Sequence, residues 1–297
     1  MKLKNIFKRI IPATYNKIDK SDKKIQKQIR EFKKPLYDFI RYTEIMYEAK
    51  ATHETIFPKY KNILRGKDVV IIGNGPTLDK WIPIDDCIQM GVNSSIFLEK
   101  LKLNYLFWQD YDLTYIQKLK ELLKKRKDIN CKLFVGMHYN PKVTPIPLYE
   151  IEALKAEPYF FYEGIICPDF FPWPFTIDIS QKPFFFYYST IFIALQFALY
   201  THPKKIFIVG CDCNTVGHHS GYVHGGDPQD DPFTPQKCEL LKDGWIRFKS
   251  FASRLYPDIE IISINPLGLK GLFHDVYTEE YLVEHPEINR NEVEIYR

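Results

Sequence analysis

A run of four β-branched residues at 69–72 (VVII) is followed directly by the segment GNGPT at 73–77, which we expect to form a loop. A short apolar run that ends at glycine is typical of a strand buried on both faces. Such strands belong to parallel sheets that helices cover on both sides, and ligands of these sheets collect outside the carboxyl ends of the strands. The run therefore predicts an α/β fold and puts the loop at the ligand-binding edge.

Other short apolar segments predict neighbours for this strand, with helical patterns between several of them. We expect strands at about 89–92, 105–108, 133–135, 206–209 and 259–264, and helices at 113–127, 190–200 and 237–255. This alternation predicts a Rossmann-like, mostly parallel sheet with helices on both faces. We assign a nucleotide-binding catalytic domain to residues 65–297. The aromatic and proline-rich stretch at about 140–186 fits neither period and predicts a lid inserted over the sheet edge.

The first 34 residues carry twelve Lys or Arg against three Asp or Glu. The apolar residues Leu3, Ile6, Phe7, Ile10 and Ile11 follow the spacing of one helix face, and Pro12 ends the run. We expect residues 1–64 to form a basic helical extension, with Pro35 separating a second helix at about 36–50. A short basic helix at 1–12 associates peripherally with an anionic membrane, or docks on its own domain or on a second subunit. Both interpretations stay open.

Apolar run length, net charge and cysteine spacing exclude several classes of protein. No apolar run reaches the roughly 20 residues of a membrane span, and no signal peptide is visible, so we expect a cytoplasmic protein, at most at the inner face of the cytoplasmic membrane. The net charge of +4 does not indicate a nucleic-acid partner. Six scattered cysteines without a CxxC pair predict reduced structural thiols and no zinc site.

The GNGPT loop offers groups that suit a phosphate or a ribose. Gly73 and Gly75 let the backbone turn and approach a ligand, Pro76 restrains one dihedral angle, and Asn74 and Thr77 supply short polar side chains. The segment is neither GxGxxG nor a Walker motif. A plain strand-to-helix turn is the alternative. If the loop binds a ligand, valine at position 75 is expected to abolish binding and leave the fold intact.

Two further predicted strand ends add polar residues. Asn93, Ser94 and the following serine come after the second strand and suit contacts to a base or ribose. Asp110 and Asp112 follow the third strand with DxD-like spacing, which suits Mg²⁺ or Mn²⁺ on a diphosphate. A helix N-cap or a solvated turn is the competing interpretation.

The segment after the 206–209 strand is rich in histidine and glycine. Asp212 follows the strand, and His218, His219 and His224 lie within seven residues, among four glycines. Histidine suits general-base catalysis because its pKa lies near neutrality. A metal cluster with Asp227 and an exposed loop of no chemical consequence stay open as alternatives. Asp212 is the reserve candidate for the base.

The segments VIIGNGPTL, VNSS and FIALQFALYTHPKKIFIVGCDC resemble the bacterial lipooligosaccharide sialyltransferases. They also resemble the related motility-associated factor glycosyltransferases and archaeal-type pterin pyrophosphokinases. The similarity spans about residues 67–273, and GNGPTL is its most specific part. The resemblance implies that Asn74, Thr77 and Asn93 hold a CMP nucleotide. It also implies that Ser189 and Thr190, before a long helix, contact the nucleotide and that Tyr222 reaches its phosphate. A histidine, His224 or one of His218 and His219, would be the general base.

Two features depart from that pattern. A basic N-terminal extension precedes the motif, and Cys213 and Asn214 stand where the family has a second tyrosine after its G-x-D strand. A donor other than CMP-sialic acid therefore stays open. From the resemblance we expect a glycosyltransferase that moves a sugar, with a CMP-linked sugar acid favoured, onto a surface glycan such as capsule or lipopolysaccharide. No cofactor or metal is expected for it, since CMP leaves with a single phosphate. The alternatives are a metal-dependent pyrophosphokinase-like transferase that uses Asp110 and Asp112, and a non-catalytic nucleotide-binding scaffold. An oligomer is compatible with each of them.

Overall fold

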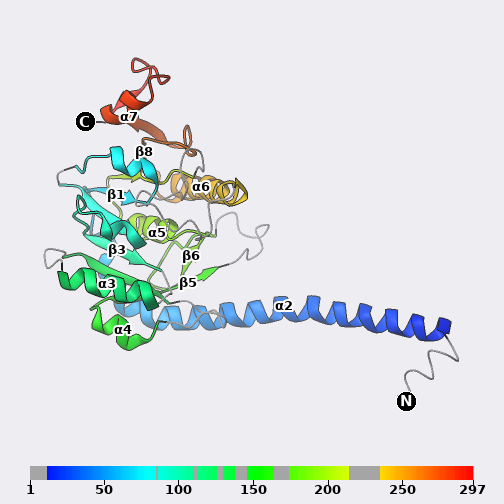
Figure 1. Ribbon diagram of the computed structural model, residues 1–297. Helices are drawn as coiled ribbons and strands as arrows, with labels where there is room; N and C mark the ends of the chain where they lie inside the picture. The colour runs from blue at the N-terminus through cyan, green and yellow to red at the C-terminus, as the bar shows by residue number, and fades with distance from the viewer. Residues whose placement is uncertain are drawn as a thin grey trace. The chain divides into compact units, whose positions relative to one another are not determined.

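The computed structural model describes residues 12–84, 86–109, 113–125, 130–137, 146–163, 174–213 and 235–296 (Figure 1). The chain divides into two compact units, Met1–Tyr47 and Glu48–Arg297. Among the described residues, the second unit contains every strand. The described part of the first unit is residues 12–47 of helix α2 (Pro12–Ile56), and the remaining residues of that helix belong to the second unit.

The predicted break at Pro35 is wrong, because α2 passes through that residue without interruption. Proline removes one backbone hydrogen bond from a helix interior and usually kinks or ends it. The turn before the proline contains Glu31, Lys33 and Lys34, which are strong helix formers, whereas the turn after it (LYDF) has only Leu36 of that kind. The helix nevertheless continues on both sides of the proline.

The described strands form one sheet of ten parallel strands, in the order β10-β9-β8-β7-β1-β2-β3-β4-β5-β6. Each β-strand pairs in parallel with its neighbours. The strands are β1 (Asp68–Ile72), β2 (Ile88–Val92), β3 (Tyr105–Trp108), β4 (Lys132–Met137), β5 (Glu157–Glu163), β6 (Phe184–Phe186), β7 (Lys205–Val209), β8 (Glu260–Ile264), β9 (His274–Tyr277) and β10 (Glu294–Ile295). The Rossmann-like α/β prediction is confirmed.

Strand order reverses at β1, which lies between β2 and β7. Ile72, the last residue of β1, is in register with Gly91 of β2 and with Val209 of β7. The segments that leave these three strands therefore begin side by side at one edge of the sheet. In open α/β sheets such a switch point is the usual place for a ligand.

Helices and short 3-10 segments cover both faces. They are η1 (Pro58–Tyr60), η2 (Pro76–Lys80), η3 (Asn93–Phe97), α3 (Leu113–Lys125), α4 (Leu148–Ala153), α5 (Ile191–Thr201), α6 (Pro235–Leu255) and α7 (Glu279–Glu284). Val69 and Ile71 of β1 face the cluster that contains α5 and α6, whereas Val70 and Ile72 pack with Leu78 of η2 on the opposite face. Adjacent strand residues point to opposite faces, so the β-branched run is buried on both sides.

Helix α5 is the central element of the larger face. Each of its residues from Ile191 to Thr201 is buried, and it contacts β1, β2 and β6. The ring of Phe197 lies 5.2 Å from that of Phe107 and 5.3 Å from that of Phe134, within an aromatic cluster that spans several strands. This packing holds the amino end of α5 at the carboxyl edge of the sheet.

The 140–186 stretch differs from the expected lid in its described parts, 146–163 and 174–186. These parts supply α4, β5 and β6, and the two strands continue the sheet beyond β4. Because strands buried on both faces read as nearly continuous apolar runs, the run YFFY of β5 and the run FFF of β6 show no period of two. Residues 140–145 and 164–173 lie outside the described ranges.

Candidate functional site

The candidate site lies at the switch point, where the segments after β1 and β7 are hydrogen-bonded to each other. The Gly73 amide donates to the Val209 carbonyl at 2.9 Å, and the Gly75 amide donates to the Gly210 carbonyl at 2.7 Å. A Cβ at position 73 would lie 2.3 Å from the Gly210 carbonyl oxygen. The two strand ends therefore approach more closely than a side chain at position 73 permits.

Gly75 is under the same constraint. A Cβ there would lie 2.5 Å from an Asp212 carboxylate oxygen and 2.7 Å from the Gly210 carbonyl oxygen. Its φ of −69° is open to every L-residue, so the backbone conformation does not require glycine. The structure thus requires these glycines for packing within the protein, which the sequence-based argument did not include. Their role in the approach to a ligand stays a prediction.

Asp212 fixes the start of η2. The Thr77 amide donates to one oxygen of its carboxylate at 2.9 Å, and the Thr77 hydroxyl donates to the other. Asp212 is 7% exposed and Thr77 is 5% exposed. A buried carboxylate that accepts two hydrogen bonds from one residue acts as a brace for the loop. This arrangement favours a positioning role for Asp212 over the reserve role of general base.

Asn74 projects between β1 and β2. Its side-chain amide donates to the Val92 carbonyl at 3.3 Å. Its side-chain oxygen is buried and has no hydrogen-bond partner among the residues that the structure describes. An unsatisfied buried acceptor is costly, and each one in a folded protein calls for an explanation. A ligand hydroxyl or amine that donates to this oxygen would supply the missing hydrogen bond.

Asn93 joins three elements at the same edge. Its side-chain oxygen accepts from the Gln109 amide at 2.9 Å, and its side-chain amide donates to the Thr190 hydroxyl oxygen at 3.3 Å. Its φ is +43°, in the left-handed region that asparagine tolerates better than most residues. Asn93 therefore connects the ends of β2 and β3 to the start of α5.

The first turn of α5 completes the described part of the site. Thr190 is the N-cap position, and the Ser189 hydroxyl oxygen accepts from the Ile191 amide at 3.4 Å. The positive end of the helix dipole favours an anion here, as at other helix amino termini. The structure thus brings Asn74, Asn93 and Thr190 to one edge.

The other predicted site residues divide into two groups. Pro76 begins η2 and Ser94 lies in η3, both half-buried and at the same edge. Outside the described residues lie Asp110, Asp112, His218, His219, Tyr222 and His224. Within the described part of the chain, no three His, Cys, Asp or Glu side chains gather as metal ligands would.

Sequence reasoning missed a polar cluster next to Ser189. The Tyr187 hydroxyl donates to the Asp243 carboxylate, which also accepts from Arg247 Nε at 2.7 Å. Burial and this carboxylate raise the pKa of Tyr187 to about 12, so the phenol stays protonated at neutral pH. Tyr188 is 42% exposed with a φ of +56°, an uncommon conformation for an aromatic residue. The contact between Tyr187 and Asp243 joins residues 56 positions apart, so no local sequence pattern predicts it.

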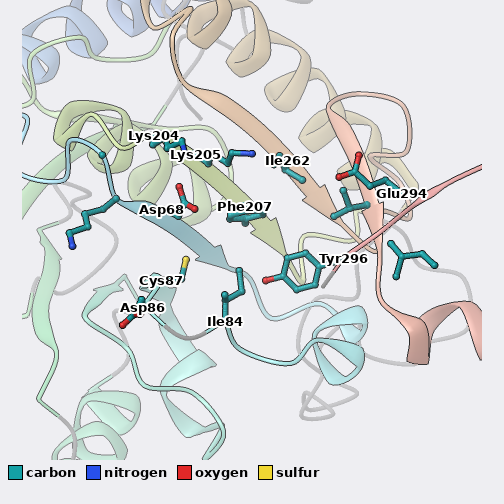
Figure 2. Close-up of a pocket in the computed structure, with 14 residues that line it drawn as sticks. Asp68, Ile84, Asp86, Cys87, Lys204, Lys205, Phe207, Ile262, Glu294 and Tyr296 are labelled. Carbon is teal, nitrogen blue, oxygen red and sulfur yellow. The ribbon is translucent and has the colours of Figure 1, made fainter.

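A pocket of about 600 Å³ opens at the opposite, amino end of the strands (Figure 2). Figure 2 shows Asp68 at the start of β1, Cys87 before β2, and Phe207 and Tyr296 beside them. Burial and the nearby Asp68 carboxylate raise the pKa of Cys87 to about 12, so this free thiol is not a nucleophile at neutral pH. No predicted site residue lines the pocket.

No protein-family model matches the chain, and no curated protein is similar enough to count as a relative. Among helices in the described ranges, none has the length and apolar character that crossing a membrane requires.

Solved structures with a similar fold include the sialyltransferase CstII from Campylobacter jejuni in complex with the substrate analogue CMP-3FNeuAc. That likeness has 15% identity, covers 78% of this chain and 86% of that chain, and has a TM-score of 0.41. They also include the MAf glycosyltransferase from Magnetospirillum magneticum AMB-1, at 12% identity, covering 80% of this chain and 38% of that chain, with a TM-score of 0.44. An α-2,3-sialyltransferase from Campylobacter jejuni in apo form matches at 14% identity over 68% of this chain and 78% of that chain, with a TM-score of 0.39.

Proposed function

We propose that the protein is a glycosyltransferase that binds a nucleotide-activated sugar at the switch point between β1 and β7. The observation that carries the proposal is the buried oxygen of Asn74, at the edge where Asn93 and Thr190 meet. In the described part of the chain this oxygen has no hydrogen-bond partner. A nucleotide supplies donors for such an oxygen through its ribose hydroxyls or its base amine. The resemblance of the GNGPTL and VNSS segments to CMP-binding sialyltransferases supports a CMP-linked donor.

The proposed reaction transfers the sugar to a hydroxyl of a cell-surface glycan such as capsule or lipopolysaccharide. The acceptor oxygen forms a bond to the anomeric carbon, the bond from that carbon to the CMP phosphate oxygen breaks, and the hydroxyl proton passes to a histidine. His224 is the first candidate for this base, followed by His218 and His219, and Tyr222 would donate to the phosphate. CMP leaves with one phosphate group, whose charge the Tyr222 hydroxyl and the positive end of the α5 dipole would stabilise without a metal.

Nucleotide binding is tested by thermal-shift titration with CMP, UDP, GDP, ATP and NAD, since a ligand of the folded state raises its stability. We expect CMP to give the largest shift. In Asn74→Ala we expect the CMP affinity to fall about tenfold, the worth of one hydrogen bond of about 1.4 kcal/mol. Asn291→Ala, at an exposed asparagine in the second unit, is the matched control. Equal CMP affinities of the wild type and Asn74→Ala would contradict the proposed site.

Catalysis is tested with single alanine variants of the three histidines. Loss of the base should lower turnover by about 10²–10⁴-fold. The CMP affinity should hardly change, because the base acts on the acceptor. If none of the three variants slows turnover even tenfold, this loop does not hold the base. Turnover that EDTA abolishes would instead favour the diphosphate transferase with a metal at Asp110 and Asp112, and binding without any turnover would favour a nucleotide-binding scaffold.

We also propose that residues 1–12 associate peripherally with the cytoplasmic membrane surface. Their apolar face and lysines support this location beside a lipid-linked acceptor. Deleting them should lower co-sedimentation with anionic liposomes and leave turnover of a soluble acceptor intact. Equal sedimentation of both proteins at low and moderate salt would refute it.

A further inference from the structure

Among the side chains of helix α2 that the structure describes, five large apolar ones are exposed and form a stripe. Ile25, Ile29, Leu36, Ile40 and Tyr47 are 52%, 43%, 49%, 47% and 79% exposed. They follow one another at intervals of 4, 7, 4 and 7 residues. At about 100° per residue, all five lie within an arc of about 60° on the helix surface.

The repeat of this stripe is 11 residues, or about 3.67 residues per turn. This value is so close to the 3.6 of a straight helix that the stripe stays on one side of α2 throughout its length. Two helices with such a repeat pack along their stripes with a slight right-handed supercoil. The pattern is therefore suited to pairing with another helix.

The length of α2 points to the same conclusion. The helix has 45 residues, about 67 Å at 1.5 Å per residue. Helices in proteins derive most of their stability from packing of an apolar face. The stripe residues all belong to the first unit, Met1–Tyr47, of which the helix is the described part. A helix of this kind needs a partner along the stripe.

Charge along the helix distinguishes between partners. Residues 17–34 carry eight Lys or Arg and three acids, whereas residues 38–48 carry three acids and one Arg. A second copy in antiparallel orientation would lay the basic half of each helix against the acidic half of the other. A parallel arrangement would bring the two basic halves together, and like charges in proximity are unfavourable.

An anionic membrane fits the stripe less well. The exposed carboxylates of Asp22 and Glu44 lie at or near the edge of the arc, and the stripe continues into the acidic half of the helix. Anionic headgroups would repel these acids.

We propose that two copies of this chain associate through α2, antiparallel, along the Ile25 to Tyr47 stripe. With the two-fold axis near Leu36, the two Leu36 side chains meet and Ile25 of one copy lies against Tyr47 of the second. Such an isologous contact closes on itself as a dimer. The pairing does not depend on the proposed glycosyltransferase activity.

Sedimentation of the full-length chain across concentration tests the pairing. The wild type should sediment at twice its 35.2 kDa mass, and the double variant Ile29→Lys/Ile40→Lys should have a dissociation constant at least tenfold higher. The double variant Gln26→Lys/Gln28→Lys adds the same charge outside the arc, so we expect it to pair like the wild type. All four positions are exposed on α2, so circular dichroism should show the same folded content in each protein.

Sedimentation in added salt and binding to lipid vesicles distinguish the antiparallel dimer from the other arrangements of α2. Added salt screens attraction between basic and acidic halves, so the dissociation constant should rise with salt for the antiparallel pair. A dissociation constant that falls with salt would overturn the antiparallel arrangement. A wild type that stays monomeric at about 100 µM, or a stripe variant that pairs as tightly as the wild type, would overturn the pairing itself. A monomer whose binding to anionic vesicles is lost in the stripe variant would assign the stripe to a membrane.

Discussion

His53 makes the stability of the second unit depend on pH. Its ring is fully buried near the end of α2. Nδ1 lies 2.8 Å from the Ile179 carbonyl oxygen and 3.1 Å from that of Lys182, and Nε2 accepts from the Phe160 amide at 2.8 Å. Nδ1 therefore carries the proton and Nε2 does not. Protonation of Nε2 would replace an acceptor by a donor that faces the Phe160 amide.

The size of the effect follows from the pKa. Burial lowers the pKa of His53 from 6.5 to about 4, against the two carbonyl contacts, which raise it. The unfolded chain therefore binds a proton below pH 6.5, whereas the folded protein does not until about pH 4. Stability from this group is complete above pH 6.5 and falls as the pH drops toward 4. The whole loss is about 3 kcal/mol, of which about 2 kcal/mol falls between pH 7.5 and 5.0.

Reversible urea unfolding of the wild type and of His53→Gln at both pH values measures this difference. The variant should be less stable at pH 7.5, by about 1–3 kcal/mol, because buried hydrogen bonds are lost. From pH 7.5 to 5.0 it should lose about 2 kcal/mol less than the wild type, because glutamine does not titrate. Equal losses in wild type and His53→Gln would refute the reasoning.

Two further predictions concern the switch point. Gly75→Ala brings a Cβ within 2.5 Å of Asp212, so we expect a loss of about 1–3 kcal/mol of stability in urea unfolding together with weaker CMP binding. A Cβ at Gly271 would meet nothing within 4 Å, but its φ of +78° strains any residue with a side chain, so Gly271→Ala should lose stability and still bind CMP as the wild type does. Equal CMP binding in both variants would contradict the packing argument. Thr77→Val removes a hydrogen bond to buried Asp212 and should lower the free energy of unfolding by about 1–3 kcal/mol, whereas Thr77→Ser should largely retain it. A valine variant as stable as the serine variant would show that the hydroxyl contributes nothing.

Much of the sheet was predictable from local pattern. The six predicted strands are present within one or two residues at most ends, because β-branched and aromatic runs between glycines leave little alternative. The strands β5, β6, β9 and β10 were missed for a different reason. β5 and β6 are aromatic runs without a period, and β9 and β10 contain charged residues and are only four and two residues long.

The candidate site, like the sheet, was predictable in part from the sequence. The position of Asn74 and Asn93 at one edge of the sheet followed from the sequence, since carboxyl ends of parallel strands share an edge. The sequence also determined that this edge is rich in glycine and amide side chains. It could not identify which neighbouring atoms lie against these glycines. The expectation that valine at position 75 leaves the fold intact conflicts with the short distances from a Cβ there to Asp212 and Gly210.

Tertiary structure alone decided which groups pair. Thr77 meets Asp212 across 135 residues, Asn93 meets Thr190 across 97, and His53 meets the Phe160 amide across 107. A local pattern reports the propensity and burial of neighbouring residues, and it carries no information about contacts that form only when distant strands and helices pack. The sequence by itself thus determined the strands and the edge at which a ligand would bind. The order of the strands decided that Asp212 braces the loop and that no group in the described ranges pairs with the Asn74 oxygen.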